Sequence, residues 1–248
     1  MFQVPREGAM KAAIDLHIHS ALSPCADKDM TPNNIVNMAC LKGLDIIALT
    51  DHNSAENAGA FLQCAKDAGI LAVPGMELET REEVHLVCLF PGIDEAMHMQ
   101  KIVYAALPDI NNREDIFGQQ MIMDREDNIL GFFPKLLVTA ADISIDEAFG
   151  TVKEHRGVII PAHVDRESYS ILSNLGMIPD NLEIQYLEAS KMCRPAHLLE
   201  RYPHLDKYKF ITSSDAHYLW DISERENFLE LEELSIQCLF DTLRGYPV

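Results

Sequence analysis

The chain has 248 residues, 48% of them hydrophobic, and a formal net charge of −19. This length and apolar content suit a single α/β domain of barrel or open-sheet type with a sizeable core. The acidic balance argues against a nucleic-acid backbone as the main partner, and no apolar run approaches the roughly 20 residues of a membrane span.

The six cysteines are scattered and form no CxxC pair, so a reduced, cytoplasmic protein is expected. The segment before Met10 is a polar leader without the apolar core of a signal peptide, and Met10 is an alternative start of the chain. The sequence leaves the oligomeric state open.

Short apolar segments alternate with helical patterns along most of the chain, which is typical of βα units around a parallel sheet or barrel. Thr31 followed by Pro32 predicts the capped start of a helix that ends at Gly43, and a second helix is expected between Ser54 and Gly69. Further helices are expected at 169–175, 195–201 and 235–243. The expected strands are Ala12–His17, Asp45–Leu49, Ile70–Val73, Val84–Phe90, Val158–Pro161, Leu182–Leu187, Phe210–Thr212 and Phe228–Leu234.

Residues 93–150 interrupt this alternation, because they are polar, look mostly helical and contain no strong strand. We interpret them as a helical insertion within one domain that spans residues 1–248, and we expect the insertion to cover the mouth of the site. The seven or eight strands outside it suit a distorted (β/α) barrel. A solvated surface explains most polar side chains of the insertion, although four could reach a substrate: Asn111, Asn112, Arg113 and Gln119.

Two histidines stand at spacing two in the segment Asp15–Ser20. If the segment is a strand, His17 and His19 point to the same face, because side chains alternate along a strand. Two imidazoles on one face form half of a metal site. The simpler alternative is a pair of surface histidines on an edge strand.

Other potential metal ligands lie where the expected strands end, and in a parallel barrel these ends meet at one rim. Six of the ten histidines share this placement, together with two carboxylates, which core packing does not explain. The donor set suits Zn, Mn or Fe better than Mg or Ca, and its size favours two or three ions. The candidate ligands are His17, His19, His52, Glu77, His85, His163, Asp215 and His217.

The ordered motifs Asp-Leu-His-x-His-Ser, Thr-Asp-His, Gly-x-Glu, Val-His-Leu, Pro-Ala-His and Ser-Asp-Ala-His resemble those of the PHP (polymerase and histidinol phosphatase) superfamily. The resemblance covers the chain from Ala12 to about Trp220. It implies a distorted seven-stranded, TIM-like (β/α) barrel, a trinuclear metal centre and, often, phosphoester hydrolysis.

Transferred to this chain, the resemblance implies a first metal held by His17, His19, Glu77 and Asp215. Glu77 would bridge to a second metal completed by His85 and His163, and His52 and His217 would hold a third. Relatives usually add a ligand for the third metal shortly after the HxH motif. This sequence has Ser23-Pro24-Cys25-Ala26-Asp27 there, so Cys25, Asp27 or neither is that ligand.

Several neighbours of these residues have open roles. Asp15 and Asp51 either orient ligand imidazoles or make structural hydrogen bonds. Glu79 lies two residues after Glu77, so both side chains would share one face of a strand and Glu79 could be a ligand. We expect it instead to pair with Arg81.

The resulting hypothesis is a metal-dependent phosphoesterase that acts on a small phosphomonoester of nucleotide or sugar phosphate type. A hydroxide bridging the metals at Glu77 would attack phosphorus in line, and Arg166 would clamp the phosphate. Lys191 and Arg194 are second candidates for the clamp, and surface ion pairing is the alternative for all three cations. Nucleic acid is expected only as a short oligonucleotide.

Two other functions remain open. The same ligands could serve a C–N or C–O hydrolase of the amidohydrolase type, although no lysine that could be carbamylated lies at an expected strand end. The chain could also be a non-catalytic, metal-binding regulatory module, which degenerate ligands would indicate.

Overall fold

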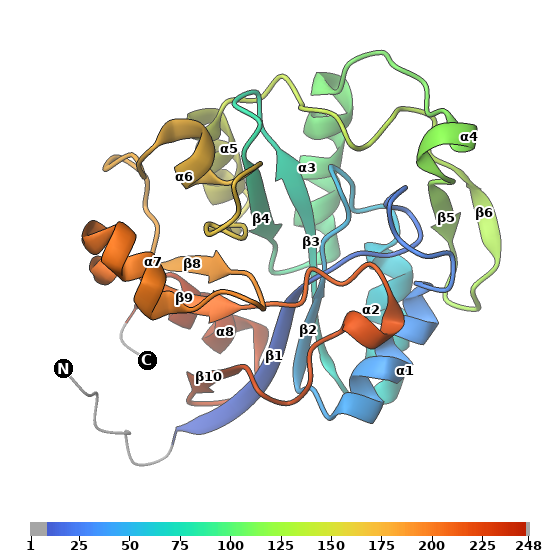
Figure 1. Ribbon diagram of the computed structural model, residues 1–248. Helices are drawn as coiled ribbons and strands as arrows, with labels where there is room; N and C mark the ends of the chain where they lie inside the picture. Colours follow the sequence, from blue (N-terminus) through green and yellow to red (C-terminus); the bar gives the residue numbers. More distant parts are fainter. Residues whose placement is uncertain (1–8, 247–248) are drawn as a thin grey trace.

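A six-stranded, curled sheet forms the centre of the computed structural model, which describes residues 9–246 (Figure 1). The strand order is β10-β1-β2-β3-β4-β7. β1, β2 and β3 run parallel, whereas β10 is antiparallel to β1, and β4 is antiparallel to both β3 and β7. The strands are β1 Met10–Ile18, β2 Ile46–Leu49, β3 Leu71–Glu79, β4 His85–Leu89, β7 Val158–Pro161 and β10 Phe228–Leu231.

A separate parallel pair, β8 (Tyr186–Ala189) and β9 (Lys209–Thr212), lies between the two ends of this sheet. It touches the sheet at the site rim, where Val164 N donates to Glu188 O at 2.8 Å and Ile18 bridges to Ala216. The expected distorted seven-stranded barrel is therefore not confirmed, and the structure has a curled half-barrel. The reason is β10, which occupies the edge of β1 from Met10 to Ala13 and leaves β9 only the far end of β1.

Helices cover both faces of the sheet. The outer face of β1 and β2 packs against α1 (Pro32–Lys42) and α2 (Ala58–Ala68) in one buried cluster, which includes Phe61. The concave face is filled by α8 (Ile236–Leu243), whose Leu239 and Phe240 pack with residues of β1, β2, β4 and β7. The concave side is thus closed by apolar packing at one end, which leaves the opposite rim for polar chemistry.

The helix ends test the capping predictions. Thr31 Oγ1 accepts from Asn34 N at 3.2 Å and Gly43 adopts φ 69°, so the predicted start and end of α1 are confirmed. The second helix begins later than the predicted start at Ser54, because α2 starts at Ala58, and Asn57 before it makes no capping side-chain bond.

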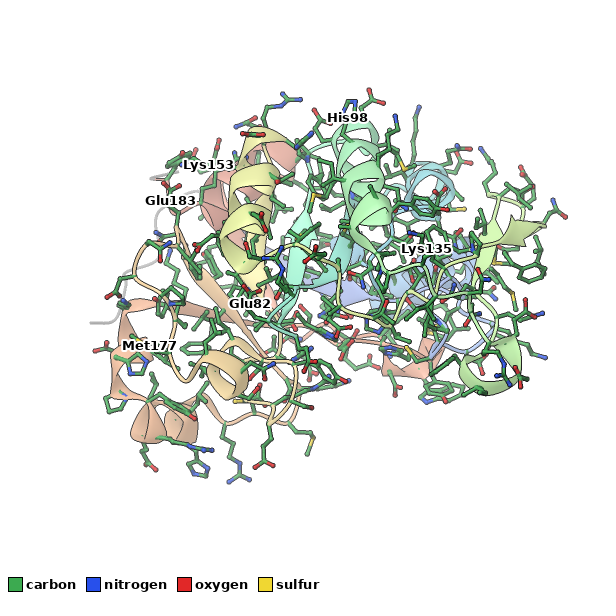
Figure 2. The ribbon with its side chains drawn as sticks, turned by 90° about the horizontal axis from the view of Figure 1, so that it is seen from above. Glu82, His98, Lys135, Lys153, Met177 and Glu183 are labelled. Carbon is green, nitrogen blue, oxygen red and sulfur yellow. The ribbon has the colours of Figure 1, made fainter. Side chains whose placement is uncertain are left out.

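The outer face of β3, β4 and β7 packs against α3 (Ile93–Ala106) and α5 (Ile145–Glu154). Figure 2 shows these helices side by side, with His98 on α3 and Lys153 on α5. Phe90 is fully buried in this cluster. Shorter elements complete the description: α4 Glu114–Phe117, β5 Met121–Met123, β6 Ile129–Phe132, α6 Ile171–Leu175, α7 Pro195–Arg201, η1 Pro203–Lys207 and η2 Leu219–Asp221.

Residues 93–150 are only partly helical, because they include the antiparallel hairpin of β5 and β6 at one side of the molecule (Figure 1). Backbone and amide bonds attach this segment to the loops that follow β1 and β2. Met121 N donates to Ala21 O at 2.9 Å, and Asn53 Nδ2 donates to Leu137 O at 2.7 Å. The segment therefore supports the loops that carry site residues.

The four polar side chains proposed to reach a substrate lie mainly at the surface. Asn112 donates to Gly118 O, Arg113 pairs with Asp115, and Gln119 donates to Glu114, while Asn111 is exposed. The described side-chain bonds of Asn112, Arg113 and Gln119 thus stay within residues 112–119, as expected of a solvated surface.

Two further expectations concern the start of the chain and membrane-spanning segments. The polar leader lies outside the described residues. Among residues 9–246, no helix combines the length and apolarity that a membrane span requires.

Candidate metal centre

The eight predicted metal ligands meet at one rim of the sheet. They come from the ends of β1 and β3, the start of β4, and the loops that follow β2, β7 and β9. All but Asp215 and His217 are no more than 9% exposed. In the described part of the chain, three groups of donor atoms are close enough to share an ion: His17/His19/Glu77/Asp215, His52/Glu77/His85 and His19/His52/His217.

An irregularity in β1 turns the two histidines of the HxH motif toward the concave face. Ala13 and Ile18 both pack against the outer helices, although they differ by five positions and would face opposite sides of a regular strand. The β1–β2 register shifts between Asp15 and Ile18. A bulge of this kind re-aims side chains next to a site, so His17 and His19 share the concave side.

His85 reaches the rim by a different route from the one predicted. We expected it inside a parallel strand, but it is the first residue of β4, which runs antiparallel to β3. The start of an antiparallel strand and the end of its neighbour lie at the same edge of a sheet. The β3–β4 hairpin therefore places His85 beside Glu77, with Nδ1 2.8 Å from Oε1.

Glu77 is the centre of the cluster. It is 1% exposed, and five imidazoles from four segments approach its two oxygens. The contacts are His17 Nε2 to Oε1 at 3.4 Å, His85 Nδ1 to Oε1 at 2.8 Å, His163 Nε2 to Oε1 at 3.2 Å, His19 Nε2 to Oε2 at 3.5 Å and His52 Nδ1 to Oε2 at 2.9 Å.

The spacing of the donors fits metal coordination. Two donors that each bond an ion at about 2.1 Å lie about 3.0 to 3.4 Å apart at angles between 90° and tetrahedral. His17 Nε2 and His19 Nε2 are 3.1 Å apart, and Asp215 Oδ1 lies 3.4 and 3.1 Å from them. Glu77 Oε2 is close to His52 Nδ1 but has no hydrogen bond of normal geometry, and His163 Nδ1 is also buried without a partner among the described residues, which is costly unless an ion or water binds there.

The shifted pKa values of Glu77 and His19 favour the protonation states that bind metal. Burial raises the pKa of the Glu77 carboxyl, but the neighbouring His85 and His17 hold that pKa well below its usual range. Burial and the nearby His217 and His52 lower the pKa of His19 well below 6.5. A carboxylate and a neutral imidazole are the forms that bind metal.

Cys25 joins the outer edge of the cluster, beside His217 and His52. Its Sγ lies 3.1 Å from His217 Nε2. Burial raises the pKa of this thiol, but hydrogen bonds to His217 and His52 lower it from 9.0 to about 6. Asp27, the alternative ligand, turns into its own loop, where Oδ1 accepts from Asp29 N at 2.8 Å.

A family model for the PHP domain matches residues 15–154, which is more than half of the chain. The chain belongs to the PHP domain family. The matched range contains five of the clustered residues and ends before the other three: His163, Asp215 and His217.

This PHP domain is similar to a phosphatase, an endonuclease and a proposed phosphoesterase. The 3′,5′-nucleoside bisphosphate phosphatase of Chromobacterium violaceum is 35% identical over 88 residues, which are 34% of this chain and 29% of that protein. The lesion-specific endonuclease Q of Pyrococcus furiosus has a TM-score of 0.69 at 18% identity, over 96% of this chain and 57% of that one. A proposed metal-dependent phosphoesterase from Bifidobacterium adolescentis has a TM-score of 0.60 at 19% identity, over 95% and 96%.

The solved structures share the fold of this PHP domain at identities too low to transfer an activity. The curated relatives match it over 8–46% of their own lengths. The chain thus spans less than half of each curated relative it matches. One endonuclease Q structure holds a 27-mer duplex substrate with an abasic lesion at the active site.

Glu188 is a residue of the site that the sequence analysis missed. His17 Nδ1 donates to its two oxygens at 3.0 and 3.1 Å, and His163 N donates to Oε1 at 3.1 Å. A carboxylate behind an imidazole fixes the ring so that the other nitrogen faces a metal. The sequence signal is a single acidic residue in an apolar strand. The expected strand ends at Leu187, one residue before Glu188, whereas β8 extends to Ala189.

The two aspartates next to ligand histidines have different roles. Asp51 accepts from Ser23 Oγ at 2.7 Å, and the same hydroxyl lies 3.0 Å from His19 Nδ1, so Asp51 orients His19 through Ser23. Asp15 accepts from the backbone N–H groups of Ser214 and Ser223 at 2.9 and 2.8 Å. Asp15 thus holds the loop that carries Asp215, which is the structural role.

Glu79 does not form the expected ion pair with Arg81. Arg81 pairs instead with Asp142 and Glu147 at the surface. The Glu79 carboxyl is 8% exposed, and its Oε2 lies 3.9 Å from His85 Nε2, on the side of the ring opposite Glu77. The Glu79 side chain therefore lies on the same side of the strand as Glu77, as their spacing of two residues indicates, and not beside Arg81.

A small cavity lies beside the cluster and contains two of the three predicted phosphate-clamp cations. It has a volume of about 240 Å³ and is lined by His163, Asp215, Arg166 and Lys191. Arg166 Nη2 lies 2.7 Å from Asp215 Oδ2. Arg194, the third cation, precedes α7 and does not line this cavity. A larger cavity of about 840 Å³ between α5, β7 and α8 shares no residue with the cluster.

Proposed function

We propose that this PHP domain is a metal-dependent phosphoesterase that hydrolyses a small phosphomonoester of nucleotide or sugar phosphate type. The observation that carries the proposal is the buried Glu77 carboxylate among five imidazoles, with a cationic cavity next to it. Imidazole and carboxylate donors in this number favour two to three ions of Mn, Zn or Fe. The net charge of −19 would repel an anionic substrate, but those ions and the nearby cations would make the site locally positive.

The residues would divide into an inner and an outer set. His17, His19, Glu77 and Asp215 would hold the first ion, and Glu77 with His85 and His163 the second. The outer set, which consists of Cys25, His52 and His217, would hold the third. Bound divalent ions supply Lewis-acid chemistry, because they lower the pKa of water and neutralise charge on phosphoryl oxygens.

The chain's own groups prepare that chemistry. Glu77 holds the inner donors around one carboxylate, and Glu188 and Ser23 fix the rings of His17 and His19. Arg166 and Lys191 would receive the phosphate and the leaving group in the cavity. The cavity of about 240 Å³ suits a small phosphorylated molecule or the end of a short oligonucleotide. We propose that residues 1–248 act as one domain, with 93–150 as its insertion.

Arg166→Ala is expected to raise the KM for a phosphomonoester about tenfold, or about 1.4 kcal/mol, with a smaller change in kcat. The Arg166 side chain is 44% exposed at the cavity, and within residues 9–246 its guanidinium pairs only with Asp215, which leaves other N–H groups for phosphate. Steady-state kinetics measures the effect, with the exposed Arg201→Ala as control. An unchanged KM would remove Arg166 from the binding role.

The proposed function is tested by phosphate release. Metal-stripped protein, reconstituted with Mn, Zn or Fe, is assayed against nucleotide and sugar phosphomonoesters, a phosphodiester and a short oligonucleotide. His17→Ala removes an inner donor, and His98→Ala on α3 removes an exposed histidine that is not part of the cluster.

Metal-dependent turnover that His17→Ala abolishes and His98→Ala retains supports the phosphoesterase, and the preferred substrate names its class. Absence of turnover with every metal, despite full metal content, would contradict it. That outcome would favour C–N or C–O hydrolysis or a non-catalytic metal-binding role.

A further inference from the structure

We propose that the outer set is a thiolate site, which selects Zn(II) or Fe(II) over Mn(II) and exchanges its ion independently of the inner set. The proposal deepens the proposed function, on which it rests for the metal dependence of the centre. It concerns the chemistry of Cys25, His52 and His217.

The first argument is distance. A zinc ion bonds thiolate sulfur at about 2.3 Å and imidazole nitrogen at about 2.0 Å, so these donors lie about 3.1 to 3.6 Å apart at angles between 90° and tetrahedral. Cys25 Sγ and His217 Nε2 are 3.1 Å apart. The rings of His52 and His217 have centroids 5.9 Å apart, and their donor atoms belong, together with that of His19, to one group within 4.8 Å.

The second argument is that the loop places Cys25 by a network of bonds. Asp27 N donates to His217 O at 2.8 Å, which joins the Cys25 loop directly to the backbone of the outer histidine. Ala26 N donates to Ser23 O at 2.9 Å, and Ser23 is itself bonded to Asp51. The thiol therefore reaches His217 from a loop that is fixed at both sides.

The third argument is donor chemistry. Thiolate sulfur favours Zn and Fe, whereas Mn and Mg favour oxygen ligands. The nearby oxygen donor, Asp27, is bonded within its own loop. The inner set contains Glu77 and Asp215 and offers oxygen to either class of metal. The two sets therefore differ in the ions they prefer.

The fourth argument is exposure. Cys25 is exposed, whereas the inner His17 and His19 are fully buried. A thiol reagent thus reaches the outer set while the inner donors stay covered. Alkylation by iodoacetamide forms an S–C bond with loss of iodide, and the resulting thioether no longer provides the thiolate.

The test uses the full chain, stripped of metal and titrated with Co(II), whose bond to thiolate gives a near-ultraviolet charge-transfer band. Wild type is compared with Cys25→Ser and Cys25→Asp. Cys40→Ser is the matched control, because Cys40 is also an exposed free cysteine. Metal content per chain is then measured after equilibration with equal Zn(II) and Mn(II).

We expect the band in wild type and Cys40→Ser and its loss in both Cys25 variants. We expect Cys25→Ser to hold one Zn(II) fewer per chain, and Cys25→Asp to bind Mn(II) in its place. Iodoacetamide should remove the same single ion from wild type, and bound Zn(II) should protect Cys25 from it.

A band that survives Cys25→Ser, or a wild type that binds cobalt at the outer set without the band, would overturn the proposal. So would an unchanged Zn(II) count in Cys25→Ser. These readouts do not depend on turnover. A thiolate band without any hydrolysis would contradict the proposed function alone, and hydrolysis without the band would contradict this inference alone.

Discussion

Glu77→Gln is expected to lower kcat/KM for phosphate release about 10³-fold or more, a loss of about 4 kcal/mol in transition-state stabilisation. The amide keeps the shape of the side chain but removes the negative charge that five imidazoles surround. Its NH₂ group would also point hydrogens at nitrogens that must act as metal ligands. Both inner ions should therefore bind more weakly.

Steady-state kinetics and metal content per chain measure this loss together. The matched control is Glu232→Gln, which removes an exposed carboxylate. Near-normal activity in Glu77→Gln, with a full metal complement, would show that Glu77 does not lie between the ions. Circular dichroism of the metal-free variant separates loss of the site from loss of the fold.

Glu79→Gln is expected to change how the stability of the metal-free protein depends on pH. Burial is the main cause that raises the pKa of Glu79 to about 7, from 4.5. Below the pKa of the unfolded state, Glu79 is protonated in both states and does not affect the free energy of unfolding. As pH rises toward 7, Glu79 ionises first in the unfolded state, and this ionisation stabilises the unfolded state. The wild type therefore loses free energy of unfolding that the amide variant keeps.

The free energy of unfolding of Glu79→Gln relative to wild type should thus rise by about 2 to 3 kcal/mol between about pH 5 and about pH 8. Urea unfolding in the presence of a chelator measures it, with the exposed Glu200→Gln as control. A difference that stays flat over this range would mean that Glu79 ionises in the folded protein as in the unfolded one. In metal-loaded protein the nearby cations favour the carboxylate, so the slope should shrink.

The parts of the centre that the sequence predicts are those specified by short local motifs. The paired imidazoles at the end of β1 and Glu77 near the end of β3 carry their identity in neighbouring residues, and the structure brings all eight predicted ligands to one rim. The start and end of α1 were predictable for the same reason, because a Thr–Pro start and a glycine end act within a single turn.

Features set by long-range pairing were not predictable. The antiparallel course of β4 depends on which edge it meets, and periodicity does not encode direction. The antiparallel β10 on β1, which prevents closure of the barrel, joins residues more than 200 positions apart. The bulge in β1 and the partner of His17, Glu188, also arise from contacts between distant segments.

The distribution of the predicted ligands along the chain has a consequence for how the protein would acquire a metal. The first donor is His17 and the last is His217, and the bond between Asp15 and Ser214 spans 199 positions. Contacts of such separation form late in folding, because loop closure must precede them. The proposed centre can therefore assemble only when nearly all of the chain is in place, and metal uptake during refolding is expected to mark the completion of the native structure.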